Sequence, residues 1–248
     1  MRTTILTVRP APDGDLDVAA LARRGVPALA APMMTPSYLA PSLADAGPCG
    51  GIVFTSRHAV TGLLACAGDR LDDNMLARPV FAVGRSTGRA ARDAGFRDVT
   101  IGHGGGAGLV PLIRAAKSQI AGPLLWPAAV HRGFDMVSAL ADLAEVMLLP
   151  VYEMGETTGL PDSADTALAN DKVLAVILMS ARSARLFRER LAETGHGGTV
   201  ANMALIAGSD AIAAAAGDGW AQSFVAKRPT RARLLAIAAL LYDRRTRP

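Results

Sequence analysis

The chain of 248 residues lacks the features of membrane and exported proteins. Its longest apolar runs, residues 173–179 and 234–241, are far shorter than the roughly 20 residues of a membrane-spanning helix. The apolar stretch near the N-terminus is too short for the core of a signal peptide, and no small-residue cleavage pattern follows it. We therefore expect a cytoplasmic protein without a membrane partner.

Cysteine and aromatic residues are also scarce. Cys49 and Cys66 are the only cysteines, and without a CxxC spacing they argue against a zinc site or a disulfide framework. Aromatic residues make up 4% of the chain, too few for base-stacking platforms, and the basic residues are dispersed, which argues against nucleic acid as a partner. The net charge of +4 fits a small polyanionic ligand better. The densest charge run, residues 243–248, is typical of a solvated tail.

Short strands and helices alternate along the sequence. Short Val, Ile and Leu runs without strict alternation are typical of strands buried on both faces. Strands are predicted at residues 4–7, 51–55, 79–83, 99–101, 124–126, 173–179, 203–206 and 223–226. Helices are predicted at residues 58–67, 87–94, 109–118, 136–143, 184–192 and 211–216. The alternation predicts an α/β protein with two doubly wound parallel-sheet domains, and a ligand at the carboxyl ends of the strands.

Two segments of the chain resemble each other. Three pairs of positions share a spacing of 124 residues: Ser56 and Ser180, Gly84 and Gly208, Gly95 and Gly219. A chance alignment is the alternative, because the chain is rich in alanine. Since the matched residues are serines and glycines at predicted strand-to-helix junctions, the spacing favours an internal duplication.

Hydroxyl side chains stand at these junctions. Thr55, Ser56 and Ser180 follow predicted strands, so their hydroxyls and the first free backbone N–H groups of the next helix point into one small volume. Such a junction binds anions without a dedicated charge; the alternative is that these residues only cap helices. Similar junctions contain Gly84, Ser86 and Thr87 in the first half and Gly208 and Ser209 in the second. Together they predict two walls of one cleft for a ligand with several negative groups.

Other motifs give weaker signals. The glycine-rich residues 102–108 suggest a dinucleotide site, but no acidic residue closes the following strand, so a flexible loop is favoured. The four histidines lack the i, i+4 spacing of a metal-binding helix. Ser56 and Ser180 have no GxSxG surroundings. We expect neither a metal nor a serine nucleophile.

Seven motifs in order resemble the uroporphyrinogen-III synthase family. They are "ILTVRP" (5–10), "VFTSRHAV" (53–60), "FAVGRSTGRAARDAGF" (81–96), "LLWP" (124–127), "PVYEM" (150–154), "ILMSARSARLF" (177–187) and "VAKRPTRARLLAIAALL" (225–241). The resemblance runs over nearly the whole chain. It implies a cytoplasmic lyase without cofactor, which cyclises hydroxymethylbilane to uroporphyrinogen III with inversion of ring D and loss of water. We expect it to act as a monomer.

The resemblance also implies a domain arrangement. The family has two α/β domains joined by a two-stranded linker, with an interdomain cleft. One domain of this chain would contain residues 1–33 and 152–248, and the other residues 34–151. The linear tetrapyrrole carries eight carboxylates, which fits a cleft with many hydrogen-bond donors.

Tyr152 is the candidate proton donor that the resemblance implies, and Thr87 corresponds to the family's threonine after "VG". Packing at a domain hinge is the alternative role for Tyr152. The residues predicted to bind substrate are Arg9, Thr55, Ser56, Arg57, Gly84, Ser86, Thr87, Ser180, Ser183, Gly208 and Ser209.

The second half departs from the family pattern. Asp210 and Ala211 follow "GS" where hydroxyl residues are usual, and a carboxylate at Asp210 would repel the substrate if it faced it. Two other functions therefore stay open. One is a two-lobed protein that binds small anions, and the other is a noncatalytic relative that binds tetrapyrroles.

Overall fold

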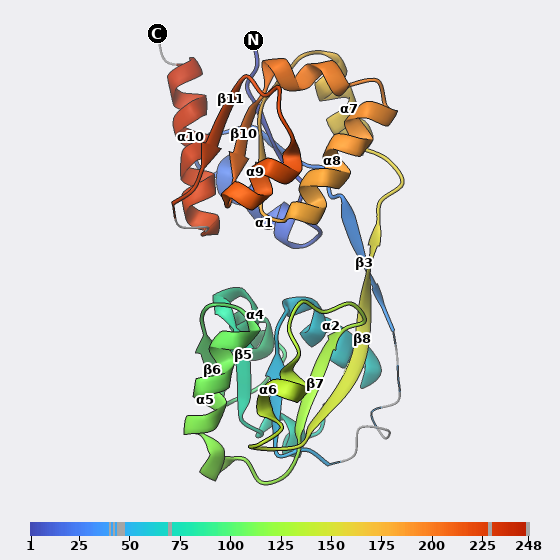
Figure 1. Ribbon diagram of the computed structural model, residues 1–248, viewed down its shortest axis with the longest axis vertical. Coiled ribbons are helices and arrows are strands. Elements are labelled where there is room, and N and C mark those ends of the chain that lie inside the picture. The colour runs from blue at the N-terminus through green and yellow to red at the C-terminus, as the bar shows by residue number, and fades with distance from the viewer. Residues whose placement is uncertain (40, 42, 44–47, 69–70, 228–229, 247–248) are drawn as a thin grey trace. The chain divides into compact units, whose positions relative to one another are not determined.

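The computed structural model describes residues 1–39, 41, 43, 48–68, 71–227 and 230–246 (Figure 1). Its strands form two separate, mainly parallel sheets, which confirms the predicted α/β class. The chain divides into two compact units. Unit 1 contains Met1–Thr35 and Gly155–Pro248, and unit 2 contains Pro36–Met154.

The sheet of unit 1 has five strands in the order β11-β10-β9-β1-β2. They are β1 (Thr4–Thr7), β2 (Ala28–Ala30), β9 (Val173–Leu178), β10 (Ala204–Ala207) and β11 (Gln222–Val225). Every neighbouring pair is parallel. The order of winding reverses between β1 and β9, so the switch point of this doubly wound sheet lies there.

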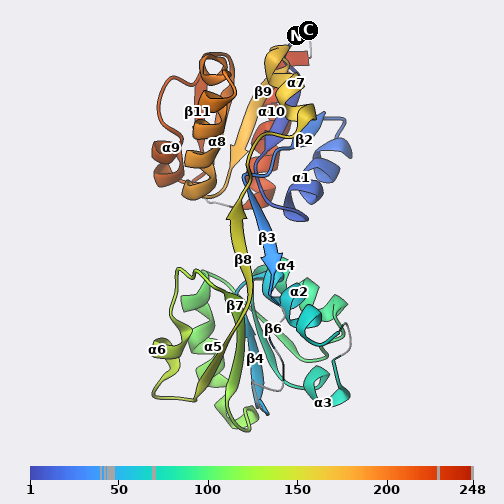
Figure 2. The same ribbon diagram turned by 90° about the vertical axis from the view of Figure 1, so that its right-hand side faces the viewer.

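Helices cover both faces of this sheet (Figures 1 and 2). They are α1 (Asp13–Ala22), α7 (Asp162–Ala169), α8 (Ala181–Glu193), α9 (Asp210–Ala216) and α10 (Arg231–Thr246), with a 3-10 helix, η4 (Gly197–Asn202). Leu21 of α1 and Leu234 of α10 pack with Ile5 and Ile177 of the sheet in one apolar core. Leu6 and Val176, the neighbouring residues whose side chains enter the opposite face, are also 0% exposed, so both faces of the sheet are buried, as the continuous apolar runs of its strands predict.

Residues 243–246 of the predicted solvated tail are helical, so the prediction of a tail is wrong for them. Asp243 to Thr246 form the last turn of α10, while residues 247 and 248 lie outside the described residues. Arg244 and Arg245 are exposed there, where the helix dipole favours positive side chains.

The sheet of unit 2 has six strands in the order β3-β8-β7-β4-β5-β6. They are β3 (Met34–Tyr38), β4 (Gly51–Phe54), β5 (Val80–Val83), β6 (Val99–Gly102), β7 (Leu124–Ala129) and β8 (Val146–Glu156). The pairs from β8 to β6 are parallel. The switch point of this sheet lies between β4 and β7.

Unit 2 has an apolar core on each face of its sheet. Its helices are α2 (Arg57–Cys66), α3 (Asp73–Leu76), α4 (Gly84–Asp93), α5 (Val110–Ala115) and α6 (Met136–Leu140), with 3-10 helices η2 (Gly106–Leu109) and η3 (Lys117–Gln119). Ile52 and Phe54 of β4 pack on the side of α2, whereas Val53 packs with Leu109 and Trp126. Successive residues of β4 therefore enter opposite cores.

The chain passes between the units within β3 and again within β8, and these strands are neighbours in the sheet. Their arrows point in opposite directions (Figure 2). The division falls after Thr35 and after Met154, a few residues beyond the boundaries at 33 and 151 that the resemblance implies. Those domain boundaries stay a prediction.

The two segments aligned by the 124-residue spacing contain the same order of elements. Unit 2 has β4-α2-α3-β5-α4-β6, and unit 1 has β9-α8-η4-β10-α9-β11, so only the short helix between the first two strands differs in type. In each sheet the three strands are adjacent in that order. The matched serines and glycines thus occupy equivalent junctions in the two units.

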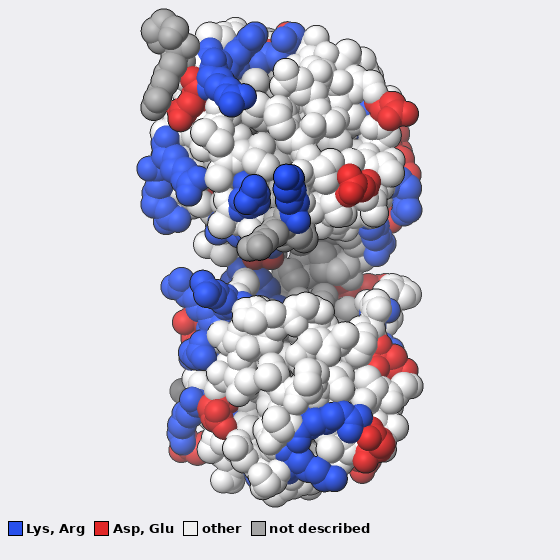
Figure 3. Space-filling model, turned by 60° about the vertical axis from the view of Figure 1, so that its left-hand side comes forward, with Lys and Arg blue, Asp and Glu red and all other residues white. Residues whose placement is uncertain are grey.

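Charged side chains are scattered over the molecular surface. On the face in Figure 3, basic and acidic residues are interspersed among uncharged ones. In the part of the chain that the structure describes, no helix is both long and apolar enough to cross a membrane.

Candidate functional site

Strands β4 and β7 separate at their carboxyl ends, at the switch point of unit 2. Their pairing ends with Ile52 opposite Leu125. The amides of Leu124 and Val130 donate toward β8, and because amides alternate along a strand, the nitrogen of Pro127 faces β4. Proline has no N–H to donate, so the ladder cannot continue. An opening between the two strands is the result.

A cavity of about 350 Å³ occupies this opening. Its lining residues are Thr55, Ser56, Gly106, Trp126, Ala129, His131, Arg132, Gly133, Phe134 and Tyr152. A second hollow of about 580 Å³ continues over the loop after β7 and shares residues 131–134 with the first. The carboxyl ends of the strands at a switch point are where doubly wound folds bind ligands.

Hydroxyl groups at the end of β4 form one wall of the cavity. Ser56 is the N-cap of α2, and its Oγ accepts a hydrogen bond of 3.2 Å from the amide of His58. The indole N–H of Trp126 donates to Thr55 Oγ1 at 3.4 Å. The predicted capping alternative is therefore observed for Ser56. A hydroxyl oxygen that accepts a bond still has its own hydrogen to donate, so both side chains can donate to an anion.

A β-bulge places Tyr152 in this wall. Ala128 of β7 is opposite Pro150, but Ala129 is opposite Tyr152, so Val151 is an extra residue in β8. Bulges re-aim side chains, often next to active sites. Val151 and Tyr152 are consecutive and yet both are buried. Tyr152 lines the cavity and also packs in the core beside α2.

The surroundings of Tyr152 keep its phenol protonated. The imidazole of His58 lies 5.6 Å from the Tyr152 ring, and His58 Nδ1 is 3.1 Å from the hydroxyl of Tyr38. Burial raises the pKa of Tyr152 above its ordinary value; a hydrogen bond with the side chain of Ser56 opposes this shift, and Tyr38 adds to it. The phenol is therefore a proton or hydrogen-bond donor at neutral pH.

Arg132 supplies a positive charge to the same cavity. Its Nη1 donates to the carbonyl oxygens of Ala129 at 2.9 Å and Val130 at 2.8 Å. The guanidinium carbon lies 5.7 Å from the centroid of the Trp126 ring, a cation–π distance. The hydrogen bonds of this guanidinium to the described residues all use Nη1, which leaves Nε and Nη2 as donors for an anion.

Comparison with known protein families identifies the family of this chain. The sequence profile described as uroporphyrinogen-III synthase HemD matches residues 16–236. The chain belongs to the uroporphyrinogen-III synthase family. Members of this family are enzymes of heme biosynthesis, and their substrate is a small tetrapyrrole. A search of curated proteins by sequence finds no significant match.

Solved structures share the fold. Uroporphyrinogen-III synthetase from Helicobacter pylori is 21% identical over 97% of this chain and 100% of that chain, with a TM-score of 0.64. A mutant uroporphyrinogen III synthase from Thermus thermophilus is 19% identical over 98% of this chain and 99% of that chain, with a TM-score of 0.56. At these identities the likeness supports the two-sheet fold of the synthase family.

Four of the residues predicted to bind substrate do not line the cavity of unit 2. Gly84, with a φ of 70°, starts α4 after β5. Ser86 is exposed, and Thr87 is only 5% exposed because it lies on the buried side of α4. Arg57 begins α2 and is half-buried, and it too is outside the lining. A role for these residues in binding the synthase substrate stays a prediction.

The corresponding junctions of unit 1 lie at the carboxyl ends of β9 and β10. Ser180 and Ser209 are the N-caps of α8 and α9, where each Oγ accepts a backbone N–H at 3.4 Å. Ser183 and Gly208 are buried. Asp210 is exposed in the first turn of α9, where the helix dipole favours a carboxylate. The helix thus gives a structural reason for this departure from the family pattern.

Arg9 follows β1 at the switch point of unit 1, but carboxylates already hold it. Its guanidinium is 2.7 Å from Asp13 and 3.3 Å from Asp17. Asp17 is fully buried and also accepts bonds from Thr7 and Arg231. These contacts favour a structural role for Arg9. Substrate binding by Arg9, and one cleft shared by the junctions of both halves, stay predictions.

The glycine-rich segment 102–108 is a packed turn rather than the loose loop expected from its composition. A Cβ at Gly108 would lie 1.6 Å from the carbonyl oxygen of His103, and one at Gly106 would lie 2.7 Å from the Phe134 ring. Gly106 therefore lets this turn approach the cavity. Within the described residues, no group of three or more His, Cys, Asp or Glu could hold a metal ion.

Proposed function

We propose that this chain is a uroporphyrinogen-III synthase, a lyase that cyclises hydroxymethylbilane to uroporphyrinogen III with inversion of ring D and loss of water. Membership of the family over residues 16–236 carries this proposal. The cavity at the switch point of unit 2 supports it, because it combines a buried phenol, two hydroxyls and a guanidinium. We further propose that the protein acts in the cytoplasm as a monomer.

The substrate needs several donors at once, since a linear tetrapyrrole of this kind carries eight carboxylates. Thr55, Ser56 and Arg132 offer hydroxyl and guanidinium N–H groups to one or two of them. Charge-assisted hydrogen bonds of this type are about twice as strong as neutral ones. We assign the remaining carboxylates to the other strand-to-helix junctions, including those at Ser180 and Ser209.

The chemistry requires one proton donor and a bent substrate. The C–O bond of the hydroxymethyl group breaks, and its oxygen leaves as water with a proton from an acid. The electrophilic azafulvene that remains forms a C–C bond with the substituted α-carbon of ring D, and the older C–C bond between that carbon and the methylene of ring C then breaks. The methylene, now electrophilic, forms a C–C bond with the free α-carbon of the turned ring D, which releases a proton. We assign the acid to Tyr152, and the released proton restores its phenol. Holding the two ends together contributes further, because it replaces a rarely populated conformer with a near-attack geometry.

The decisive test is to incubate the purified full chain with freshly generated hydroxymethylbilane and to resolve the type I and type III products. We expect the type III isomer at a rate far above spontaneous closure. Only the type I isomer, formed at the spontaneous rate, would contradict the proposal. Tetrapyrrole binding without turnover would then identify a noncatalytic relative.

A further inference from the structure

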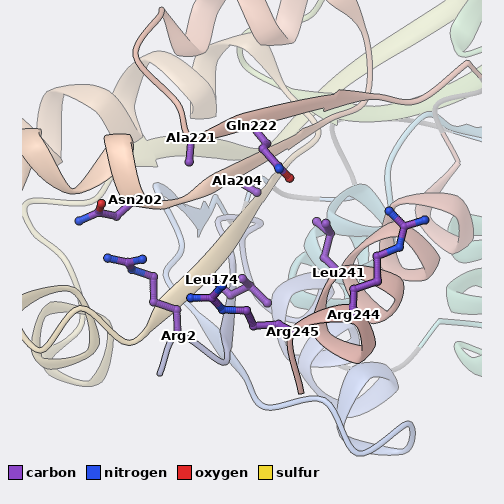
Figure 4. A pocket seen from close by; sticks show the side chains of 9 residues that line it. All are labelled: Arg2, Leu174, Asn202, Ala204, Ala221, Gln222, Leu241, Arg244 and Arg245. Carbon is purple, nitrogen blue, oxygen red and sulfur yellow. The ribbon is translucent and has the colours of Figure 1, made fainter. Parts of the chain in front are cut away.

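A separate cavity lies in unit 1, at the amino ends of its strands and therefore at the opposite end of the sheet from Ser180 and Ser209. Its volume is about 370 Å³. Leu174 near the start of β9, Ala204 at the start of β10 and Gln222 at the start of β11 contribute to it. The full lining is Arg2, Leu174, Asn202, Ala204, Ala221, Gln222, Leu241, Arg244 and Arg245 (Figure 4).

Three arginines line this cavity, and no acidic residue does. Figure 4 shows Arg2 and Asn202 on one side of the cavity, and Arg244 with Leu241 on the other. Arg2 comes from the N-terminal segment, whereas Arg244 and Arg245 belong to the last turn of α10. Positive charges gathered around a small volume repel one another, and a bound anion would offset this repulsion.

The arginines differ in how they are paired. Arg2 Nε donates to Asp171 Oδ1 at 2.8 Å, and its Nη2 bonds the other carboxylate oxygen of Asp171. Arg244 and Arg245 have no hydrogen bond or ion pair with the residues that the structure describes. Two guanidinium forks are thus open to an anion, and a third is open to competition with Asp171.

Helix stability alone gives one explanation of Arg244 and Arg245, because cations are favoured at the C-terminus of a helix. It does not account for the remaining lining. Leu174 and Leu241 offer apolar surface between the guanidinium groups, and the carboxamides of Asn202 and Gln222 offer both donors and acceptors. Small-molecule sites combine an apolar lining with a few polar groups in this way.

We propose that this cavity binds a small phosphate monoester with a flat ring, of the size of a nucleoside monophosphate. Arg245, whose side chain runs toward Arg2 in Figure 4, binds the phosphate oxygens, since the guanidinium fork matches phosphate geometry, and Arg244 adds positive charge on the opposite side of the cavity. The ring packs on Leu174 and Leu241, and the carboxamides of Asn202 and Gln222 bind its polar groups. The proposal does not depend on the function assigned to unit 2.

The test is isothermal titration of the purified full chain with adenosine monophosphate at low ionic strength. We expect a dissociation constant below about 1 mM, a weaker affinity for inorganic phosphate, and no binding of adenosine. Affinity should fall as salt is added. Equal binding of adenosine would overturn the proposal, as would binding of citrate but not of adenosine monophosphate, which would make this a polycarboxylate site.

Single substitutions locate the site. Arg245→Gln should weaken binding of adenosine monophosphate about tenfold, as expected for the loss of one charge-assisted contact, and Arg244→Gln about twofold, as expected for the loss of a more distant charge. Arg233→Gln is the matched control, because Arg233 is exposed in the first turn of the same helix, outside the cavity. An equal loss in all three variants would contradict the site. Unchanged affinity in the first two, with reduced stability, would leave only the role in helix stability.

Asp171→Asn tests the site through a substitution that should increase its affinity for adenosine monophosphate. Asp171 has a φ of 51°, a left-handed conformation that asparagine tolerates. The change removes the carboxylate that competes for Arg2, so affinity for adenosine monophosphate should rise about threefold or more. Lower affinity in this variant would exclude Arg2 from the site.

Discussion

Tyr152 lines the cavity of unit 2, and the assignment of its phenol as the acid can be tested by removing one oxygen. If the phenol is the sole proton donor, the turnover of Tyr152→Phe should be about 10²- to 10⁴-fold lower than that of the parent, with nearly unchanged product affinity. If the phenol only orients the substrate, the loss is about 2- to 13-fold, equivalent to roughly 0.5–1.5 kcal/mol, and is partly seen in substrate binding. We expect an intermediate loss nearer the second range, because the substrate ionises readily without help.

The readout is the rate and the ratio of type III to type I product at saturating substrate. Tyr242→Phe is the control, since Tyr242 lies in α10 and not in the lining of the unit 2 cavity. A parental rate together with a parental ratio in Tyr152→Phe would remove Tyr152 from the mechanism.

Tyr152 also predicts an alkaline limit to stability. Burial raises the pKa of its phenol in the folded protein, so above about pH 10 the unfolded chain releases this proton while the folded chain keeps it. The contribution of this residue is complete below about pH 10 and is lost as the pH rises through the folded pKa. Denaturant unfolding at several pH values should show the parent losing stability relative to Tyr152→Phe only above about pH 10. A constant difference between the two proteins would contradict the raised pKa.

Asp17 is a buried charge whose removal should strongly reduce stability. It is 0% exposed, and its loss would leave Arg9 and Arg231 without this partner. Removing one side of a buried pair typically costs about 3–5 kcal/mol, so Asp17→Ala should lower the free energy of unfolding by about that amount. Asp15→Ala, an exposed position on the same helix, should change it by less than about 0.5 kcal/mol. Similar losses in both variants would disprove the importance of the Asp17 cluster.

At the scale of elements, apolar runs predicted eight strands, and each has a counterpart in the structure. The three strands that were missed have physical reasons. β2 is three residues of Ala and Leu, too short to stand out. β3 and β8 contain Pro36 and Pro150, which usually exclude a central strand. In β8, Pro150 stands next to the bulge, where proline is tolerated.

Each of the six predicted helices has a counterpart, but some of their ends differ, and α1, α3, α7 and α10 were not among the predictions. The helix predicted at residues 87–94 begins at Gly84, and the one predicted at 184–192 begins at Ala181, because the first turns carry polar residues that the apolar pattern does not include. The same limit applies to the site. Thr55, Ser56 and Tyr152 were selected by residue type, whereas Arg132 and Trp126 were missed because nothing local shows that β7 lies beside β4.

Helix α2 approaches β8 closely at one glycine. A Cβ at Gly62 would lie 2.7 Å from Val151 Cγ2 and 2.8 Å from its carbonyl oxygen. Ala normally stabilises a helix interior by about 0.5–1 kcal/mol relative to Gly, but here the backbone must move, so Gly62→Ala should destabilise by about 1–3 kcal/mol. It should also reduce turnover, since Val151 precedes Tyr152. In Gly198→Ala, where the added Cβ meets nothing within 4 Å, neither quantity should change; stabilisation in Gly62→Ala would refute the close contact.

At the scale of the whole molecule, each unit has an apolar core of its own. Unit 2 contains Trp126 and unit 1 contains Trp220, the only tryptophans of the chain. Fluorescence of Trp220→Phe therefore reports unit 2, and that of Trp126→Phe reports unit 1. We expect different urea midpoints for the two variants, and Asp17→Ala should shift only the transition seen through Trp220. Coincident transitions that Asp17→Ala shifts together would show that the units unfold as one.

The sequence-based prediction was strongest for this largest scale. Alternating strands and helices indicated two parallel sheets, and the motif order indicated the family. The order of strands within each sheet was beyond reach, because β1 is paired with β9 across most of the sequence. Neither the apolar pattern nor the turn residues indicate which distant strand lies beside β1.

Because unit 1 is formed by two separate segments of the chain, its folding during synthesis on the ribosome is delayed. Unit 2 is continuous and can fold as soon as it emerges. β1 must wait for β9, which is made about 150 residues after β2, or roughly 7–30 s later at common rates of translation. During that time the apolar side chains of Ile5 and Leu6, fully buried in the finished protein, lack the strand that covers their edge. We therefore expect β1 to be a segment through which the nascent chain can aggregate before β9 is made.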